Sequence, residues 1–260
     1  MASVRGKLVL VTGASAGIGE ACARLFAEHG ARLLLMARRE QRLRELARTL
    51  QAHHGVAVMT CALDVRRRED VEATLQGLPE AWREIDILVN NAGLARGLGA
   101  VHTGDPADWD EMIDTNVKGL LYVTRVVLAG MVARRQGQVI NIGSIAGREV
   151  YPGGNVYCAS KFAVTALTRG MAMDLLGTGV RVSTVDPGLV QTEFSQVRFR
   201  GDAERARRVY EGLQPLSAAD VAEAVLFCAT RPPHATVREL VLTPTAQASA
   251  VHVFRTTPRQ

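Results

Sequence analysis

Tyr157 and Lys161 are the residues whose types and spacing point most directly to chemistry in this sequence. They are four positions apart, so a helix would place both side chains on one face. A free phenol has a pKa of about 10, but a neighbouring ammonium stabilises the phenolate and lowers that pKa. The spacing therefore predicts that Tyr157 acts as a general acid or base next to Lys161. A surface contact between the two side chains is the alternative that the pair alone leaves open.

The elements that must position this pair alternate between short apolar runs and amphipathic segments, up to about residue 243. Apolar runs of this kind are typical of parallel strands covered by helices on both faces. The alternation predicts an α/β fold, a doubly wound parallel seven-stranded sheet of the Rossmann type. The predicted strands are Lys7–Thr12, Arg32–Ala37, Val56–Cys61, Ile85–Asn90, Gln138–Gly143, Arg181–Asp186 and Glu239–Thr243. The predicted helices are Ile18–His29, Glu40–His53, Arg67–Gly77, Asp108–Arg135, Asn155–Leu176 and Ala218–Thr230.

We expect residues 1–260 to form one domain, because no Pro/Ser-rich linker or change of composition divides them. Residues 191–215 interrupt the alternation and contain many arginines. Their place after the sixth strand predicts a substrate lid over the carboxyl ends of the strands, where doubly wound folds bind ligands. The C-terminal tail, residues 244–260, is left with three possible roles: closing the pocket, contacting another subunit or neither.

The composition limits the partners that we expect. The net charge is +5, but the basic residues are dispersed and not interleaved with aromatics, so we predict no nucleic-acid partner. The four cysteines form no CxxC motif and indicate reduced, buried thiols in a cytoplasmic protein. We predict no metal site, no signal peptide and no membrane span.

A glycine-rich segment, Thr12 to Glu20, connects the first predicted strand to the first predicted helix. Glycines permit a tight turn and let the backbone approach a pyrophosphate, whose charge the helix N-terminus attracts. The spacing is GxxxGxG and misses the GxGxxG fingerprint, so a glycine-rich connection without a ligand is the alternative. The predicted cofactor contacts in this segment are Gly13, Ser15, Ala16, Gly17, Ile18 and Gly19.

The end of the second strand predicts which dinucleotide binds. NAD sites commonly place a carboxylate there, whereas an arginine accommodates the 2′-phosphate of NADP. Ala37 supplies no carboxylate, and Arg38 and Arg39 follow it. We therefore predict NADP(H) as the cofactor, the alternative being that the two arginines are simply a solvated helix start.

Taken together, these motifs resemble the short-chain dehydrogenase/reductase family over residues 5–243. The resemblance implies that Tyr157 exchanges the proton on the substrate oxygen while a nicotinamide exchanges hydride with the adjoining carbon. It also implies that Lys161 lowers the pKa of Tyr157 and holds the nicotinamide ribose, that Ser144 binds the substrate oxygen, and that Asn116 maintains a proton relay through water. The residues that bear it are Thr12 to Gly19, Asp64-Val65, Asn90 to Gly93, Asn116, Ser144, Tyr157 with Lys161, and Pro187-Gly188.

The same resemblance implies further contacts with the cofactor. Asp64 and Val65 would meet the adenine; a helix N-cap is the alternative role for Asp64. The remaining implied contacts are Asn91, Ala92 and Gly93 on the adenosine ribose side, and Pro187, Gly188, Val190 and Thr192 beside the nicotinamide. Ordinary turn, cap and strand-end hydrogen bonds are the alternative for each polar member of the set.

A closer resemblance is to bacterial NADP-dependent 3-hydroxy acid or serine (allo-threonine) dehydrogenases, and it includes the long run from Pro187 to Gly201. It implies oxidation of the 3-hydroxyl of serine, allo-threonine or 3-hydroxypropionate, or reduction of 3-oxo acids such as malonic semialdehyde. A substrate carboxylate suits the planar fork of an arginine. The candidates are Arg148, Arg198 and Arg200, with an exposed pair between Arg148 and Glu149 as the alternative.

Two other functions stay open at this point. One is a broad carbonyl reductase or a 3-oxoacyl-carrier-protein reductase, and the other is a non-catalytic NADP(H)-binding regulator. The helices 108–135 and 155–176 also contain more apolar side chains than one sheet face needs, and the resemblance favours a homotetramer built on them. The apolar residues concerned are Leu120, Leu121, Val126, Val127, Phe162, Leu167 and Met171.

Overall fold

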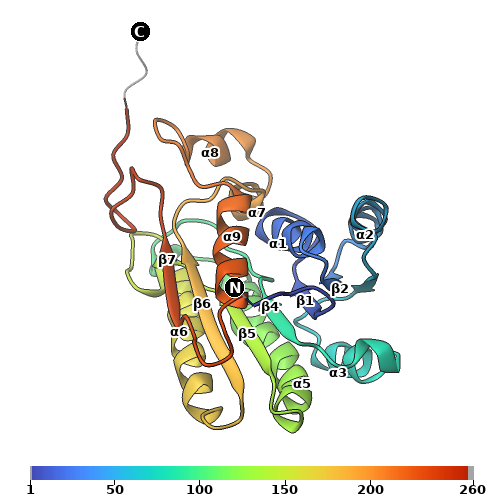
Figure 1. Ribbon diagram of the computed structural model, residues 1–260. Helices are drawn as coiled ribbons and strands as arrows, with labels where there is room; N and C mark the ends of the chain where they lie inside the picture. The colour runs from blue at the N-terminus through green and yellow to red at the C-terminus, as the bar shows by residue number, and fades with distance from the viewer. Residues whose placement is uncertain (1, 257–260) are drawn as a thin grey trace.

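Parallel strands form a seven-stranded sheet in the order β3-β2-β1-β4-β5-β6-β7, with helices on both faces (Figure 1). The computed structural model describes residues 2–256. The chain leaves β1 toward β2 on one side and returns through β4 on the other, which opens a crevice at the carboxyl ends of these strands. The strands are β1 Leu8–Thr12, β2 Arg32–Ala37, β3 Val58–Ala62, β4 Ile87–Asn90, β5 Gly137–Ile142, β6 Val180–Pro187 and β7 Glu239–Leu242.

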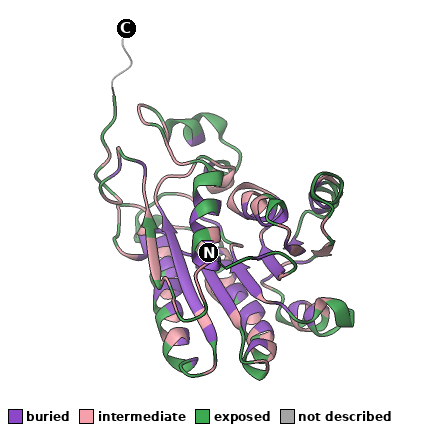
Figure 2. Cartoon of the chain, in the orientation of Figure 1, coloured by how far each residue is buried: buried purple, intermediate pink, exposed green. Residues whose placement is uncertain are grey.

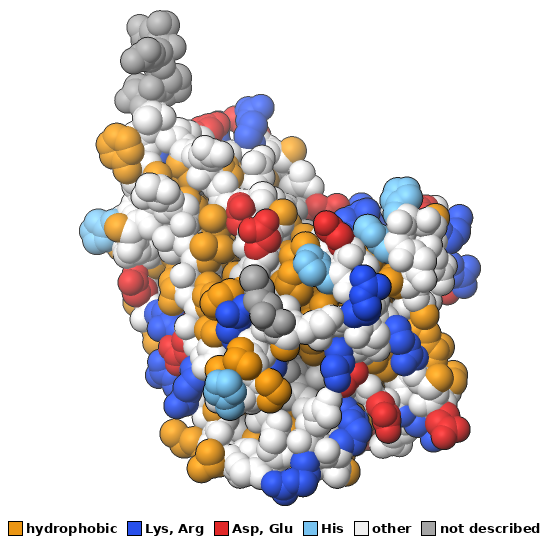
Figure 3. Space-filling model, viewed as in Figure 1, with side chains coloured by type: hydrophobic (Ala, Val, Ile, Leu, Met, Phe, Trp, Pro, Cys, Tyr) orange, Lys and Arg blue, Asp and Glu red, His pale blue; other side chains and the backbone are white. Residues whose placement is uncertain are grey.

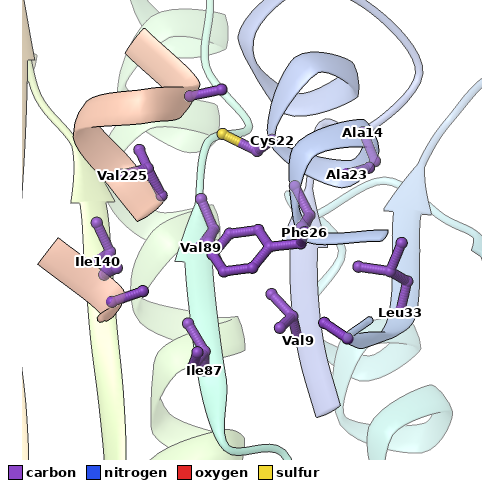
Figure 4. Packing of buried hydrophobic residues seen from close by; sticks show 14 of the residues in the cluster. Val9, Ala14, Cys22, Ala23, Phe26, Leu33, Ile87, Val89, Ile140 and Val225 are labelled. Carbon is purple, nitrogen blue, oxygen red and sulfur yellow. The ribbon is translucent and has the colours of Figure 1, made fainter. Parts of the chain in front are cut away.

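The helices divide between the two faces of the sheet, each with its own apolar core. The helices α1, α2 and α9 pack on one face, where Phe26 of α1 lies between Val9 and Val89 (Figure 4). The helices α3, α5 and α6 pack on the other. Figure 2 shows that the central strands are buried between these two layers. The α-helices are α1 Gly17–Glu28, α2 Glu40–His54, α3 Arg68–Gln76, α4 Pro106–Ile113, α5 Leu120–Ala133, α6 Asn155–Asp174, α7 Phe194–Arg198, α8 Ala203–Arg208 and α9 Ala218–Ala229.

The predicted Rossmann-type fold is confirmed, and the largest difference lies in the segment 108–135, which we predicted as one helix. A π-helical turn, η3 Asp114–Gly119, separates α4 from α5. The helix also begins earlier, because the Asp105 side chain accepts a hydrogen bond from the backbone of Ala107 and Pro106 occupies the first turn. π-helical turns are frequent at functional sites, and this one contains Asn116.

Segment 191–215 contains two short helices, α7 and α8, which the sequence did not predict. Five and six residues are too few to show a helical period, and the Asp202 cap that starts α8 is a local signal. The tail extends along this segment, since the backbone N–H of Thr256 donates to Gly212 (2.7 Å). It also reaches the loop after β6, where the Gln247 side chain accepts from Leu189 (2.8 Å). Residues 257–260 of the tail lie outside the described part of the chain.

By length and composition alone, the helical run Pro106–Ala133 is long and apolar enough to cross a membrane. In the fold, Val123, Val127 and Met131 of this run are buried against the sheet, which is the usual place of an apolar core helix. On the face shown in Figure 3, acidic and basic side chains are interspersed.

Ion pairs attach the edge strand β7 to the rest of the sheet. Glu239 on β7 pairs with Arg148, and with Arg169 of α6 (2.7 Å). Arg148 in turn pairs with the buried Asp186 of β6 (2.7 Å). Hydrogen bonds from Arg169 and Arg148 lower the pKa of Glu239 from 4.5 to about 2.

We expect Glu239→Gln to reduce the free energy of unfolding by about 1–3 kcal/mol at neutral pH, because the ion pairs are lost. A carboxyl group with a lowered folded-state pKa stabilises the fold above its unfolded-state pKa and loses this effect as pH falls. The difference in the free energy of unfolding between wild type and Glu239→Gln should therefore be largest above about pH 4.5 and decrease toward pH 2. Urea unfolding followed by circular dichroism at several pH values measures it. Glu84→Gln, at an exposed position, is the matched control, and a pH-independent difference would contradict the prediction.

Candidate active site

A cleft of about 330 Å³ opens at the carboxyl ends of the strands, between the glycine-rich turn and α7. It gathers residues from each of the loops that follow β1 to β6. The predicted site residues that line it are Gly13, Ser15, Ala16, Gly17, Ile18, Arg38, Arg39, Asp64, Val65, Asn91, Ala92, Gly93, Ser144, Tyr157, Lys161, Pro187, Gly188, Val190 and Thr192. The predicted residues that do not line it are Gly19, Asn116, Arg148, Arg198 and Arg200.

The glycine-rich turn is packed tightly against the loop after β4. The Asn91 amide donates to the backbone oxygens of Thr12 (2.9 Å) and Gly13 (3.2 Å). A Cβ at Gly13, whose φ is +65°, would lie 2.8 Å from the Asn91 Nδ2, and one at Gly19 only 2.4 Å from it. Gly19 is therefore needed for close packing against Asn91 behind the cleft.

The start of α1 is suited to a pyrophosphate. Its N-cap position is Ala16, and no side chain among the described residues 2–256 caps the first N–H groups of this helix. The turn before it, Gly13 to Ile18, lines the cleft, so its backbone is accessible to a ligand. Free N–H groups at a helix N-terminus bind phosphate oxygens, and this cradle fits the pyrophosphate of a dinucleotide.

The ends of β2 and β3 form the other rim of the cleft. Arg38 and Arg39 follow the buried Ala37, and the Arg39 Nε donates to the Ser15 Oγ (3.1 Å). Asp64 is bound by Arg66 (2.6 Å), and although burial raises its pKa, the hydrogen bonds from Arg66 bring it below the usual value. Asp64 is not the N-cap of α3, which begins later in the chain.

Tyr157 and Lys161 lie on one face of α6, as predicted, but they are not directly paired at their polar ends. The Lys161 Nζ donates to the backbone oxygen of Ile142 at the end of β5 (2.9 Å). Burial lowers the pKa of Lys161 to about 8, opposed by the charge of Asp186. Burial also raises the pKa of Tyr157, against the effects of a hydrogen bond with Ser144 and of the Arg198 charge. The predicted effect of Lys161 on the pKa of Tyr157 therefore stays a prediction.

Ser144 and Asn116 support the cleft in different ways. Ser144 is buried beside Tyr157, and its Oγ accepts a hydrogen bond from the backbone of Ala146 (3.1 Å). The Asn116 amide exchanges two hydrogen bonds with the backbone of Leu94 (both 2.9 Å) and donates to the Ser160 Oγ (2.9 Å). In this arrangement Asn116 fixes the loop that follows β4 and does not itself line the cleft.

The three arginines predicted to bind a substrate carboxylate have different surroundings. Arg148 pairs with Asp186 and Glu239, in place of the pair with Glu149 that was the alternative. Arg200 is exposed and pairs with Asp108 (2.6 Å). In both cases acidic side chains pair with the guanidinium, and neither arginine lines the cleft.

Arg198 is the exception, because its guanidinium carbon lies 5.5 Å from the centre of the Tyr157 ring. It lines a smaller cavity of about 220 Å³ that Tyr157 also borders. Arg198 donates to the Gly97 backbone oxygen (2.9 Å) and the Tyr151 hydroxyl (2.8 Å), which fix its orientation.

Sequence reasoning missed two aromatic neighbours of Tyr157 and one acidic residue. The Phe194 ring of α7 packs on Tyr157 at 5.6 Å, and Tyr151 anchors Arg198. Glu193, just before Phe194, lines the cleft and pairs with Arg39 (2.8 Å). The run Thr192 to Gly201 singled out this region, but its spacing did not show which side chains turn inward.

Comparison with known proteins relates the chain to proteins of known class. The family model for short chain dehydrogenase matches residues 7–203. The chain is 49% identical over 244 residues to an NADP-dependent 3-hydroxy acid dehydrogenase of Salmonella typhi, covering 94% of this chain and 97% of the relative. It is 40% identical over 256 residues to an NADP-dependent 3-hydroxy acid dehydrogenase of Schizosaccharomyces pombe, covering 98% and 99%.

The chain is also similar to solved structures of dehydrogenases. The closed form of a serine dehydrogenase complexed with NADP⁺ superposes with a TM-score of 0.89 at 46% identity, covering 97% of this chain and 100% of the other. Serine dehydrogenase from Escherichia coli superposes with a TM-score of 0.79 at 42% identity, covering 93% and 99%.

Proposed function

The chain belongs to the short-chain dehydrogenase family and is an NADP-dependent oxidoreductase, and from this premise we propose that its substrates are small 3-hydroxy acids. It oxidises the 3-hydroxyl of serine, allo-threonine or 3-hydroxypropionate, or reduces the 3-oxo group of acids such as malonic semialdehyde. The similarity to 3-hydroxy acid and serine dehydrogenases supports this substrate class.

The residues at the end of the cleft supply the proton chemistry that this reaction requires. NADP(H), when bound, exchanges a hydride with the carbon that bears the substrate oxygen. Tyr157 gives a proton to that oxygen during reduction and removes it during oxidation. Ser144 stabilises the same oxygen with a hydrogen bond as negative charge develops on it. Lys161 holds the nicotinamide ribose, and Asn116 maintains the proton relay through water.

The position of Arg198 is the observation that most favours a carboxylate substrate. Its guanidinium lies 5.5 Å from the ring of Tyr157 and lines the cavity next to it. In a 3-hydroxy acid, the carbon that bears the hydroxyl is two carbon–carbon bonds from the carboxylate carbon. One substrate molecule can therefore place its hydroxyl at Tyr157 and its carboxylate at Arg198. An arginine binds a carboxylate through charge-assisted hydrogen bonds, and this would orient the C3 carbon.

We also propose that the segment 191–215 acts as a lid, because Phe194 and Val197 of this segment line the cleft.

We further propose that the protein is cytoplasmic, because its four cysteines form no CxxC motif and indicate reduced thiols.

Turnover tests the assignment of reaction and substrate together. We expect NADP⁺ reduction with L-serine or 3-hydroxypropionate, and loss of at least about 10²-fold in kcat for Tyr157→Phe because the proton donor is removed. NADPH binding by this variant should stay within about twofold of wild type, since the hydroxyl alone is changed. Reduction of an acetoacetyl thioester in preference to 3-oxo acids would favour a carrier-protein reductase. Tight NADPH binding with no turnover on any substrate would favour a regulator.

Kinetics of an Arg198 variant test the carboxylate contact. We expect Arg198→Gln to raise KM for a 3-hydroxy acid about 10- to 100-fold, because a charged hydrogen bond is lost. KM for the methyl ester of the same acid should change little, which separates carboxylate binding from general damage to the cavity. Arg200→Gln, which removes the same charge outside the cleft, is the matched control. Equal effects on acid and ester would show that Arg198 only supports the cavity.

The oligomeric state is a further prediction. Leu121 and Phe162 on α5 and α6 are about two-fifths exposed at 38% and 41%, and Met173 is 71% exposed, so we propose a homotetramer that covers these helices. Light scattering at micromolar concentration should give the tetramer mass, and Leu121→Glu should shift it to smaller species. Val101→Glu changes an exposed apolar residue elsewhere and should leave the mass unchanged. A monomeric wild type would contradict the proposal.

A further inference from the structure

Glu193 lies at the junction between the loop after β6 and the lid helix α7. Its carboxylate accepts from Arg39 (2.8 Å) through one oxygen and from Arg42 of α2 (2.6 Å) through the other. Hydrogen bonds from these two arginines lower the pKa of Glu193, so the group is an anion at neutral pH. The lid is therefore linked to the side of the cleft where β2 ends.

Arg39 connects this link to the glycine-rich turn. Its Nε donates to the Ser15 Oγ (3.1 Å) while its Nη1 donates to Glu193. The residue before Glu193 also lies close to this turn, because a Cβ added at Gly17 would be 3.3 Å from the Thr192 Cβ. Glu193, Arg39 and Ser15 thus form a bridge across the mouth of the cleft, and all three line it.

The bridge is held by ion pairs that a stronger anion can displace. The Arg39, Glu193 and Arg42 side chains are 44%, 39% and 48% exposed, and pairs in such surroundings are weak. A phosphate monoester has a charge of about −1.5 to −2 at pH 7 and presents three acceptor oxygens, against a single charge on a carboxylate. It would take the donors of Arg39 in preference to Glu193.

We propose that Glu193 modulates cofactor specificity by competing with the 2′-phosphate of NADP(H) for Arg39, which lowers the preference for NADP(H) over NAD(H). This rests on the proposed role of Arg38 and Arg39 as the 2′-phosphate site. NAD(H), which has a hydroxyl at this position, leaves Glu193 on the arginines. NADP(H) displaces Glu193 from Arg39. Because Glu193 immediately precedes α7, binding of the 2′-phosphate is thereby coupled to the start of the lid.

Binding measured without turnover tests this inference. In Glu193→Gln, NADPH and adenosine 2′,5′-bisphosphate should bind about 3- to 10-fold more tightly, because a neutral amide competes less for the arginines. NADH and 5′-AMP should bind as they do to wild type, because neither has the phosphate that must displace Glu193. Isothermal titration calorimetry at fixed salt concentration measures all four ligands. The two adenosine phosphates lack the nicotinamide, so their comparison isolates the 2′-phosphate.

Glu204→Gln is the matched control, since it removes the same charge from an exposed ion pair on the lid helix α8. An equal gain in this control would overturn the inference in favour of a general charge effect. Weaker binding of both NADPH and NADH by Glu193→Gln would also overturn it, because Glu193 would then hold the lid over any dinucleotide. Unchanged binding of all four ligands would overturn it as well. A wild type that binds adenosine 2′,5′-bisphosphate no better than 5′-AMP would instead contradict the proposed 2′-phosphate site.

Discussion

The burial of the Lys161 ammonium is the constraint on which the arrangement of the site depends. An isolated charge in the interior is strongly disfavoured unless hydrogen bonds and opposite charge compensate it. The carbonyl of Ile142 at the end of β5 accepts from Lys161, and Asp186 of β6 supplies the opposing charge. Asp186 is fully buried and needs Arg148, which pairs in turn with Glu239 on the edge strand. A chain of charges therefore runs from the edge of the sheet to the lysine of the cleft.

This series of charged residues shows which parts of the site could be predicted from the sequence and which could not. Tyr157 and Lys161 were recognised because helical spacing is local, and the glycine turn was recognised because it follows a strand and precedes a helix. The partners of Arg148 were not, because Asp186 and Glu239 lie 38 and 91 positions away and only the order of the strands brings them together. The sequence alone does not distinguish an exposed arginine from a half-buried one such as Arg148.

Asn116 illustrates a second limit. The family resemblance implied a functional role for Asn116, and the helix that contains it was predicted in one piece. The structure interrupts this helix with a π-helical turn, in which both ends of the Asn116 amide bind the backbone of Leu94. Hydrophobic periodicity records which face of a helix is buried, and it does not register one extra residue in a turn. The segments that position Asn116 were therefore predictable, while the turn that aims it was not.

The protonation state of Tyr157 connects this geometry to the chemistry. Burial raises the pKa of Tyr157, which favours the neutral phenol, and this is the form that donates a proton. Lys161, with a pKa of about 8, is mainly charged at neutral pH but is directed to Ile142. In the proposed reaction, reduction of a carbonyl group requires the phenol form of Tyr157. Oxidation requires the phenolate form, which a positive charge close to the hydroxyl favours. The two directions of the reaction therefore make different demands on the same pair of residues.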